Sequence, residues 1–439
     1  MTTDLTDEQT EALEFLRDFE TSGERMACLA GYAGVGKTYL VSRWLREVRN
    51  LRLCVAAPTH QALKVLAEKC GENQRLQFYT LAALLGEAPE TDPETGEETF
   101  APSTGRKDGH FDLIVVDECS MVAQRVFNEL TSSTAKVLFV GDPAQLPPVG
   151  DRHESPAFGV PAKFQMTQIV RQQAGNPIIN LSLMIRQKMA SPGFVLVDDM
   201  RAVLTDDRRR FNFCTHADLY PFAEWAYREG WRAPILAFKN ETVIRHNRAM
   251  HDRLFPDAPF FAAGEPLLSY ETKWMDGAPV LHNGEVVTCE SCDPASNPYG
   301  VPAFRVTFRR ESGASVTCRV TPDERGLVAM KKDAIRQVAF WRGHAHRSVD
   351  HLGKYMAAVE RRDYLQGFIR IRHAYACTVH KSQGSTYDAA FLDWADISSS
   401  RTQQAKMHYV AVTRAADCLV VAEPPPRAAR GAASPAPRL

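Results

Sequence analysis

The sequence lacks any apolar run that approaches the roughly 18 residues needed to span a membrane. Its first residues, MTTDLTDEQTEALEF, also lack the basic and apolar regions of a signal peptide. These two absences argue against a membrane-embedded or secreted protein. We therefore expect a cytoplasmic protein with no membrane partner.

The chain has almost no net charge, with a formal value of -1 at pH 7. It therefore lacks the overall basic balance of many small nucleic-acid-binding domains. The charge is unevenly distributed, however, because residues 300–373 contain fifteen Lys or Arg and seven Asp or Glu. Such a stretch is either a solvated surface or a face that follows phosphate groups.

Cysteine spacing gives no disulfide framework and only half of a metal site. The ten cysteines are scattered, and several lie in apolar runs such as LCVAAP and YACTV, where a thiol acts as a small hydrophobic group. Cys289 and Cys292 have the spacing of half a zinc site, but no second pair follows. Cys318 and His282 could complete it only by a coincidence of folding, so we favour reduced, structural cysteines and no zinc.

The chain length and the strand pattern predict two α/β domains. A chain of 439 residues is too long for one ordinary core, and 44% hydrophobic with 24% charged residues is typical of a globular protein. The apolar run LRLCVAAP is followed by FDLIVVDE at 111–118 and AKVLFVGD at 135–142, both of which end in acidic residues. A second α/β pattern begins near WRAPILAFKN and resumes at YACTVHKSQG. Buried parallel strands with chemistry at their carboxyl ends give this pattern.

Two stretches interrupt the α/β pattern. Residues 86–110 are rich in Pro, Gly and Glu and have no helical period, which predicts a β-hairpin. Residues 276–370 begin as alternating runs separated by Asn-Gly and Ser-Gly turn signals, which predicts a β insertion. Residues 423–439 are poor in large apolar side chains, and we expect a disordered tail.

A phosphate-binding loop is the most specific motif. Gly31-Tyr-Ala-Gly-Val-Gly-Lys37-Thr38 fits the pattern G-x-x-x-x-G-K-[ST], with an apolar strand before it and an amphipathic helix after it. Its backbone N–H groups would wrap phosphates at a helix N-terminus. Lys37 would neutralise the β and γ phosphates of ATP, and Thr38 would offer a hydroxyl to Mg²⁺.

Downstream residues supply the remaining chemistry of phosphoryl transfer. Asp117 and Glu118 end an apolar strand, so Asp117 is expected to hold Mg²⁺ and Glu118 to polarise the attacking water. Gln145, after the next strand, could orient that water. Arg171 and Arg414 are candidates for a finger on the transition-state charge, although each alone would more often be a surface ion pair.

Taken in order, seven segments resemble the RecD-like branch (1B) of superfamily 1 DNA helicases, and the length and insertions look most like its compact phage Dda type. The segments are GYAGVGKT, APTHQALK, VVDECSM, GDPAQLPPVG, TQIVRQ, YACTVHKSQGSTYD and YVAVTRA. The resemblance runs from Leu5 to Val421. It is weakest in the insertions and absent from the tail.

The resemblance implies two RecA-like P-loop domains with parallel sheets and ATP between them. The first would span 1–175 and carry a pin hairpin at 86–110, the second would span 176–275 and 371–422, and 276–370 would be an SH3-like module. The implied catalytic residues are Lys37, Glu118, Gln145, Arg171 and Arg414. The implied nucleotide-binding residues are Gln9, Gly31, Ala33, Gly34, Val35, Gly36, Lys37, Thr38, Tyr39, Gln145, Arg171, Gly384 and Arg414, with Thr38 and Asp117 on the metal.

The resemblance also implies a track for single-stranded DNA. Its residues would be Pro58, Thr59, His60, Thr80, Thr378, His380 and Lys381. For His60 and His380, a buried or solvated histidine is the alternative. Phe100, the only aromatic residue in 86–110, would stack on a base pair at the tip of the pin, or else serve as a small local hydrophobic anchor.

The sequence departs from the family at Tyr32, where Pro is frequent, and at Tyr39, where a small polar residue is usual. These departures concern nucleotide affinity and leave the chemistry in place. We expect a monomeric ATP-dependent helicase that moves 5′ to 3′ on single-stranded DNA and opens forks, with single-strand-binding or replication and recombination proteins as further partners. Two other interpretations stay open: a motor that strips proteins from DNA, and an ATP-switched DNA-binding subunit of a recombination complex.

Overall fold

The computed structural model of the 439-residue chain describes residues 5–71, 75–91, 98–102, 105–148, 150–151, 153–168, 176–189, 197–201, 210–258, 260–275, 278–400 and 403–423. The chain divides into two compact units. Unit 1 comprises residues 1–143, 147–169 and 255–374, and unit 2 comprises residues 144–146, 170–254 and 375–439.

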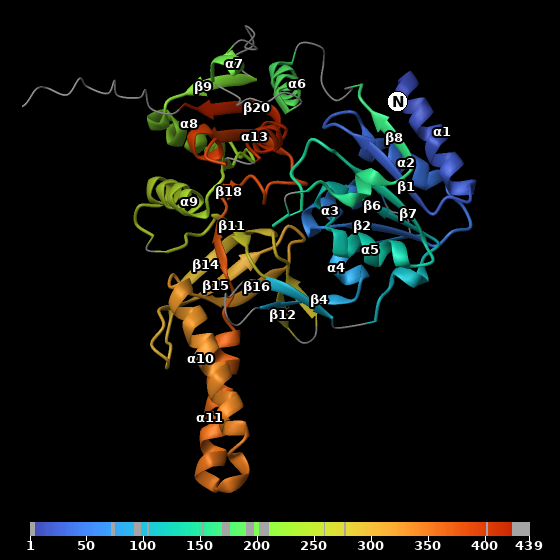
Figure 1. Cartoon of the computed structure of the whole chain (residues 1–439). Coiled ribbons are helices and arrows are strands. Elements are labelled where there is room, and N and C mark those ends of the chain that lie inside the picture. Colours follow the sequence, from blue (N-terminus) through green and yellow to red (C-terminus); the bar gives the residue numbers. More distant parts are fainter. Residues whose placement is uncertain are drawn as a thin grey trace, which may run out of the picture. The chain divides into compact units, whose positions relative to one another are not determined.

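Unit 1 contains a six-stranded parallel sheet (Figure 1). Its strand order is β3 (Leu76–Thr80), β2 (Leu53–Ala57), β6 (Leu113–Val116), β7 (Lys136–Gly141), β1 (Met26–Gly31) and β8 (Ala162–Met166). The accompanying helices are α1 (Asp7–Thr21), α2 (Lys37–Glu47), α3 (His60–Cys70), α4 (Leu81–Leu84) and α5 (Gln124–Ser132), with 3-10 turns η1 (Asp108–His110), η2 (Cys119–Met121) and η3 (Pro156–Gly159).

The four central strands of the sheet of unit 1, β2, β6, β7 and β1, are buried on both faces, which explains why they are almost entirely apolar. Alternate residues of a strand point to opposite faces, so Leu29 and Val115 join one hydrophobic cluster while Cys28 and Val116 join the other. Helix α2 covers the first cluster with a stripe that includes the fully buried Trp44. Parallel strands require such two-sided cover.

Unit 2 contains a second parallel sheet, of five strands. Its order is β18 (Ala376–Thr378), β10 (Ile235–Ala237), β19 (Tyr387–Asp393), β20 (Ala415–Ala422) and β9 (Phe211–Cys214). Its helices are α6 (Pro177–Met189), α7 (Val197–Arg201), α8 (His216–Arg228), α9 (Asn240–Leu254), α12 (Trp394–Ile397) and α13 (Gln404–Val412).

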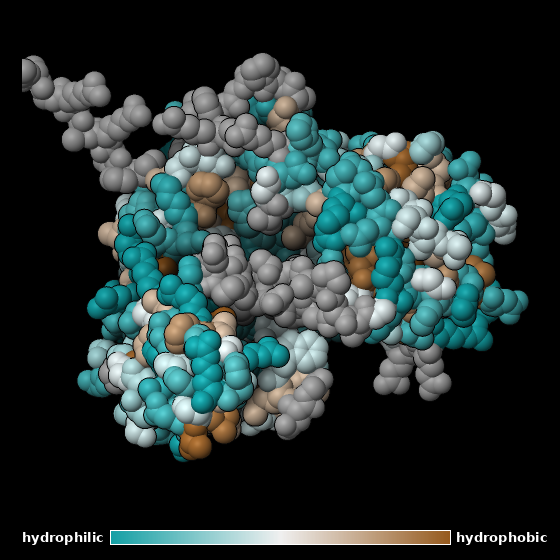
Figure 2. Space-filling view, turned by 60° about the horizontal axis from the view of Figure 1, so that its bottom comes forward, coloured by the Kyte–Doolittle hydropathy of each residue, from teal (hydrophilic) through white to brown (hydrophobic). Residues whose placement is uncertain are grey.

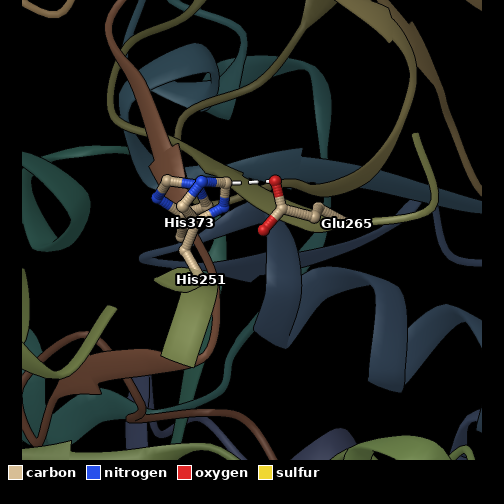
Figure 3. Close-up of side chains that lie close together, drawn as sticks. All are labelled: His251, Glu265 and His373. Atoms are coloured by element: carbon tan, nitrogen blue, oxygen red, sulfur yellow. Dashed lines mark ion pairs between the residues drawn. The ribbon is translucent and has the colours of Figure 1, made fainter. Parts of the chain in front are cut away.

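An antiparallel sheet forms the β insertion and belongs to unit 1. Its strands are β16 (Ser315–Val320), β15 (Ala303–Arg309), β14 (Val286–Ala295), β11 (Pro266–Ser269) and β17 (Ile371–His373), and β12 (Lys273–Met275) pairs with β13 (Ala278–Leu281) beside it. At one edge of this sheet, His373 Nε2 lies 3.5 Å from Glu265 Oε2 (Figure 3). The Glu265 carboxylate is fully buried and also accepts a hydrogen bond from the Ala262 N–H, at 2.6 Å.

Two long helices follow β16 and form a hairpin that projects from the antiparallel sheet (Figure 1). They are α10 (Glu324–Arg342) and α11 (Val349–Gln366), joined through η4 (Ala345–Arg347). The sequence analysis predicted only β structure in this insertion. The sequence does carry a helical spacing here, because the apolar Leu327 and Ala334 are two helical turns apart. Both residues are buried on α10.

The fold class predicted from the sequence is confirmed: two parallel sheets, an antiparallel insertion and a small hairpin are all present. The small hairpin pairs β4 (Glu87–Thr91) with β5 (Glu98–Pro102). The finer domain boundaries remain predictions, and the tail from 424 lies outside the described residues. None of the described helices combines the length and the apolar character needed to cross a membrane.

Candidate functional site

The phosphate loop connects β1 to α2 in unit 1. Gly36 caps the N-terminus of α2 in the left-handed conformation, with φ 89° and ψ 17°. This conformation is readily available only to glycine, and the space is closed as well, because a Cβ on Gly36 would lie 2.6 Å from Gln9 Nε2. The loop therefore leaves the first N–H groups of α2 available for an anion.

Lys37 folds back over this loop. Its ammonium group donates hydrogen bonds to the carbonyl oxygens of Gly31, at 2.7 Å, and Tyr32, at 3.0 Å. These carbonyls hold the lysine beside the N-terminus of α2, where phosphate would bind. Of the other loop residues named from the sequence, Val35 is fully buried and Tyr39 is 43% exposed.

Gln9 contacts the phosphate loop from α1. Its side chain completes a capping box with Thr6, in which the Thr6 N–H donates to Gln9 Oε1 at 3.2 Å. The Gln9 Nε2 group donates to the Val35 carbonyl oxygen at 3.3 Å. Gln9 thus lies against the phosphate loop, and the nucleotide-binding role that the family resemblance implies for it stays a prediction.

Asp117 and Glu118 follow β6 at the carboxyl end of the sheet of unit 1. Burial raises the pKa of Asp117, while the N–H of Glu118 and the positive charge of Lys37 act in the opposite direction. Strands β1 and β6 belong to one parallel sheet, so the loop after β1 and the acidic pair after β6 lie at the same edge of that sheet. The charge of Lys37 also acts on Asp117. Glu118 has φ 51° and ψ 42°, a left-handed conformation that is unfavourable for a residue with a side chain.

The donor chemistry at this site fits a hard divalent cation. Thr38 brings a hydroxyl and Asp117 a carboxylate, which are the oxygen ligands that Mg²⁺ prefers. A carboxylate whose pKa is raised is stabilised in its charged form when a cation binds beside it. Thr38 and Asp117 are therefore suitable Mg²⁺ ligands.

Gln145 lies after β7 and belongs to unit 2 by its contacts. It is buried, and its Oε1 atom has no hydrogen-bond partner among the described residues. A buried amide oxygen in this state is available to a ligand or a water molecule. Arg171, the other predicted contributor from this part of the chain, lies outside the described residues.

Arg414 lies at the carboxyl end of α13 in unit 2 and is buried. Its guanidinium donates to the carbonyl oxygens of Val410, at 3.0 Å, and Ser385, at 2.9 Å. Ser385 directly follows the HKSQG segment, and the guanidinium also donates to the carbonyl oxygen of Ser382 within that segment, at 3.5 Å. The same segment includes Gly384, with φ 76°. The prediction linked Arg414 and Gly384 to the same ligand, and the structure places them in one local cluster.

Gln383 is a residue that the sequence reasoning missed. Its side chain is 3% exposed, and neither its Oε1 nor its Nε2 atom has a hydrogen-bond partner among the described residues. Two orphaned polar atoms on one buried amide are costly unless a ligand or water satisfies them. The only signal in the sequence was its place inside the HKSQG segment.

Three threonines predicted on the DNA track share one structural role. The hydroxyl oxygens of Thr59, Thr80 and Thr378 accept hydrogen bonds from the N–H groups of Ala62, Ala83 and Lys381, at 3.2 to 3.3 Å. Each follows or ends a strand and begins a helix or turn. The three side-chain oxygens therefore cap the helix or turn that follows each strand.

His60, at the start of α3, stacks on His282 of the β insertion, with ring centroids 3.8 Å apart and an interplanar angle of 27°. Burial lowers the pKa of His60 to about 4, with further lowering by His282 and Arg310 and an opposing effect from Glu285. The ion pair between Lys64 and Glu311 joins α3 to the same insertion. This insertion therefore holds His60 neutral at physiological pH.

The remaining predicted residues are His380 and Phe100 of the DNA site and the cysteines that could bind a metal. Burial lowers the pKa of His380, whose ring lies 6.2 Å from that of Phe238. Phe100 belongs to β5 and pairs with Pro89, and the surroundings of its side chain lie outside the description. The ten cysteines form no disulfide. Burial raises the pKa of Cys289 to about 12, and neither it nor Cys292 belongs to a candidate metal cluster in the described chain.

Two family models match this chain, one near its N-terminus and one near its C-terminus. Residues 4–207 match a family model described as an AAA domain, and residues 373–422 match one described as a UvrD-like helicase C-terminal domain. An uncharacterized protein of Acanthamoeba polyphaga mimivirus is 31% identical over 185 residues, which are 36% of each chain. The ATP-dependent RecD2 DNA helicase of Deinococcus radiodurans is 33% identical over 181 residues, 40% of this chain and 23% of the relative.

The ATP-dependent DNA helicase dda of Enterobacteria phage T4 is 24% identical over 306 residues, which are 65% of this chain and 67% of the relative. The chain spans well under half the length of the first two relatives. The matched segments carry the phosphate loop, the acidic pair and the HKSQG and Arg414 cluster described above. Over these segments the chain is similar to the ATP-dependent DNA helicases RecD2 and dda and to the AAA and UvrD-like helicase C-terminal family models.

Proposed function

We propose that this chain is an ATP-dependent DNA helicase that translocates 5′ to 3′ on single-stranded DNA and unwinds duplex DNA at forks. The observation that carries the proposal is that Lys37 lies on a phosphate loop after β1, while Asp117 and the strained Glu118 follow β6 of the same parallel sheet. The names of two relatives, RecD2 and dda, describe ATP-dependent DNA helicases.

The proposed chemistry uses a few groups in separate roles. Lys37 would exchange its carbonyl partners for the β and γ phosphates, and Glu118 would orient and polarise the attacking water. Thr38 and Asp117 would hold Mg²⁺, which neutralises developing phosphate charge when bound. Gln145 would contact the same water.

Arginine side chains would stabilise the transition state. Arg414 is buried and oriented by backbone carbonyls, so it loses little freedom when it meets a phosphate. Arg171 is proposed for the same charge from the sequence alone. In other phosphoryl-transfer systems, such an arginine accelerates the reaction by roughly 10³ to 10⁵.

The proposed DNA track consists of two clusters, each in one unit. In unit 1, Pro58, Thr59, His60 and Thr80 lie at the ends of β2 and β3. In unit 2, Thr378, His380 and Lys381 follow β18 in the same way. A neutral His60 can accept a hydrogen bond or stack on a base without repelling a neighbouring cation, and Phe100 is proposed to stack on the base pair at the fork.

The first experiment measures ATP hydrolysis by the purified chain with and without single-stranded DNA. Glu118→Gln should retain nucleotide binding and lose most turnover, because it removes the carboxylate that polarises water. Glu14→Gln, at an exposed position on α1, removes one negative charge from the same unit and should behave as the parent chain. Turnover by Glu118→Gln at the parental rate would contradict the assignment.

The second experiment tests unwinding and direction with matched substrates that carry only a 5′ or only a 3′ tail. We expect unwinding from the 5′ tail. Preferential unwinding from the 3′ tail would contradict the direction. Displacement of a protein from single-stranded DNA without strand separation would favour a protein-stripping motor. A rate of ATP hydrolysis that does not change when single-stranded DNA is added would favour a passive DNA-binding subunit.

A further inference from the structure

The excess of positive charge in residues 300–373 separates into two groups in the structure. Seven of the fifteen cations form ion pairs, Arg319 lies over the Tyr364 ring, and Lys331 is partly buried, with a pKa lowered by desolvation. Within the described chain, the other six have no ion pair. They are Arg305, Arg325, Lys332, Arg336, Arg342 and Arg347.

Five of these six cations lie on the α10–α11 hairpin, and three of them form a row. Arg325, Lys332 and Arg336 are seven and four residues apart on α10, so they fall within about 40° of one another around the helix axis. The row spans about 16 Å along that axis. The buried Leu327 and Ala334 lie on the opposite face, so the row points away from α11.

Acidic residues next to this row are already engaged elsewhere. Glu324 pairs with Arg372, with Arg372 Nη2 2.6 Å from Glu324 Oε2, and Asp333 pairs with Arg361, with Arg361 Nη1 2.8 Å from Asp333 Oδ2. The positive charge of the row is therefore not neutralised by Glu324 or Asp333. The surface of the hairpin is mostly hydrophilic (Figure 2). A straight row of unpaired cations on a rigid helix is suited to a line of phosphates.

We propose that the row Arg325–Lys332–Arg336 on α10 is a binding site for the phosphate backbone of duplex DNA. The proposed contacts go to backbone phosphates, and such contacts carry no sequence information directly. Its length corresponds to a few phosphates of one strand, and its helix is held from behind by α11. This site rests on the proposed DNA helicase function and would grip the duplex of a fork substrate, apart from the single-stranded track.

The salt dependence of binding tests this site directly. The logarithm of the binding constant for duplex DNA falls linearly with the logarithm of the salt concentration, and each phosphate contact contributes about -0.9 to that slope. The triple variant Arg325→Gln, Lys332→Gln and Arg336→Gln should therefore make the negative slope for a 5′-tailed duplex smaller in magnitude by about 2.7. The slope for the single-stranded tail alone should stay at the parental value.

A matched control lies on the same hairpin. Lys354→Gln, Arg361→Gln and Arg362→Gln remove the same charge, but these cations are paired with Asp350, Asp333 and Asp363. The control should leave the duplex slope unchanged. An equal change in both triple variants would show that net charge alone matters and would overturn the proposal, as would an unchanged slope in the row variant.

The remaining outcomes also have defined meanings. Binding of polyglutamate that depends on the row, with an unchanged duplex slope, would assign the row to an acidic protein and overturn the proposal. The affinities are measured without ATP, and DNA-stimulated ATP hydrolysis is measured in parallel. A parent chain that hydrolyses no ATP but shows the row-dependent duplex slope would refute the helicase function and retain the site.

Discussion

Substitution of Glu118 by glycine should stabilise unit 1 while abolishing ATP turnover. Glu118 is held at φ 51° and ψ 42° directly after β6. The left-handed conformation costs a residue with a Cβ roughly 1–2 kcal/mol. Glycine removes that cost, but it gives the unfolded chain extra freedom worth about 0.4–1 kcal/mol. The expected net stabilisation is about 0.5–1 kcal/mol.

The measurement is calorimetric unfolding of the full chain without nucleotide, together with ATP hydrolysis. A gain of this size should raise the transition temperature of unit 1 by roughly 1–3 °C. Glu118→Gln is the matched control, because it removes the same charge and keeps the backbone strain. The reasoning about strain would be refuted if the glycine variant unfolded at or below the temperature of the glutamine variant.

Three further predictions concern Arg414, His60 and Phe100. Arg414→Ala should lose ATP turnover, keep single-strand binding and destabilise unit 2, because buried carbonyls lose their donor; equal loss of DNA binding would instead make Arg414 a track residue. The pKa of His60 is about 4 in the folded chain and ordinarily 6.5, so the unfolded chain binds the extra proton between these values and stability should fall as pH falls through this window. His60→Phe should flatten that decline in acid-unfolding curves, and an unchanged curve would exclude His60 as its source. Phe100→Ala should slow unwinding of duplex substrates while DNA-stimulated ATP hydrolysis continues, and an unchanged unwinding rate would remove Phe100 from the pin.

The local geometry of the phosphate loop could be predicted from the sequence because it depends on neighbouring residues. Gly36 must adopt a positive φ where β1 turns into α2, and the apolar runs on both sides set the strand and the helix. The acidic pair after β6 was predictable for the same reason. The carboxyl ends of parallel strands share one edge of a sheet, so residues distant in the sequence converge there.

The helical hairpin shows where sequence patterns were insufficient. The turn signals before Val320 predicted strands correctly, but the same expectation was carried through to residue 370, where α10 and α11 form. Their burial is confined to a narrow seam, with Ala334 and Ala358 among the few buried residues. A narrow apolar seam gives a weak periodic signal against a strongly charged background.

The sequence by itself determined which groups this protein has for handling phosphate, because the spacing from Gly31 to Thr38 and the position of Asp117 are properties of short segments. Only the tertiary structure decided which partners those and other groups meet. His60 stacks on a ring more than two hundred positions away. Gln383 is buried, and its amide has no hydrogen-bond partner within the part of the chain that the structure describes. Likewise, the composition of 300–373 gave the excess of cations, whereas folding consumed some in ion pairs and left Arg325, Lys332 and Arg336 aligned on one helix face. The physical reason is that burial and charge pairing depend on distances through space, which chain proximity constrains only over a few residues.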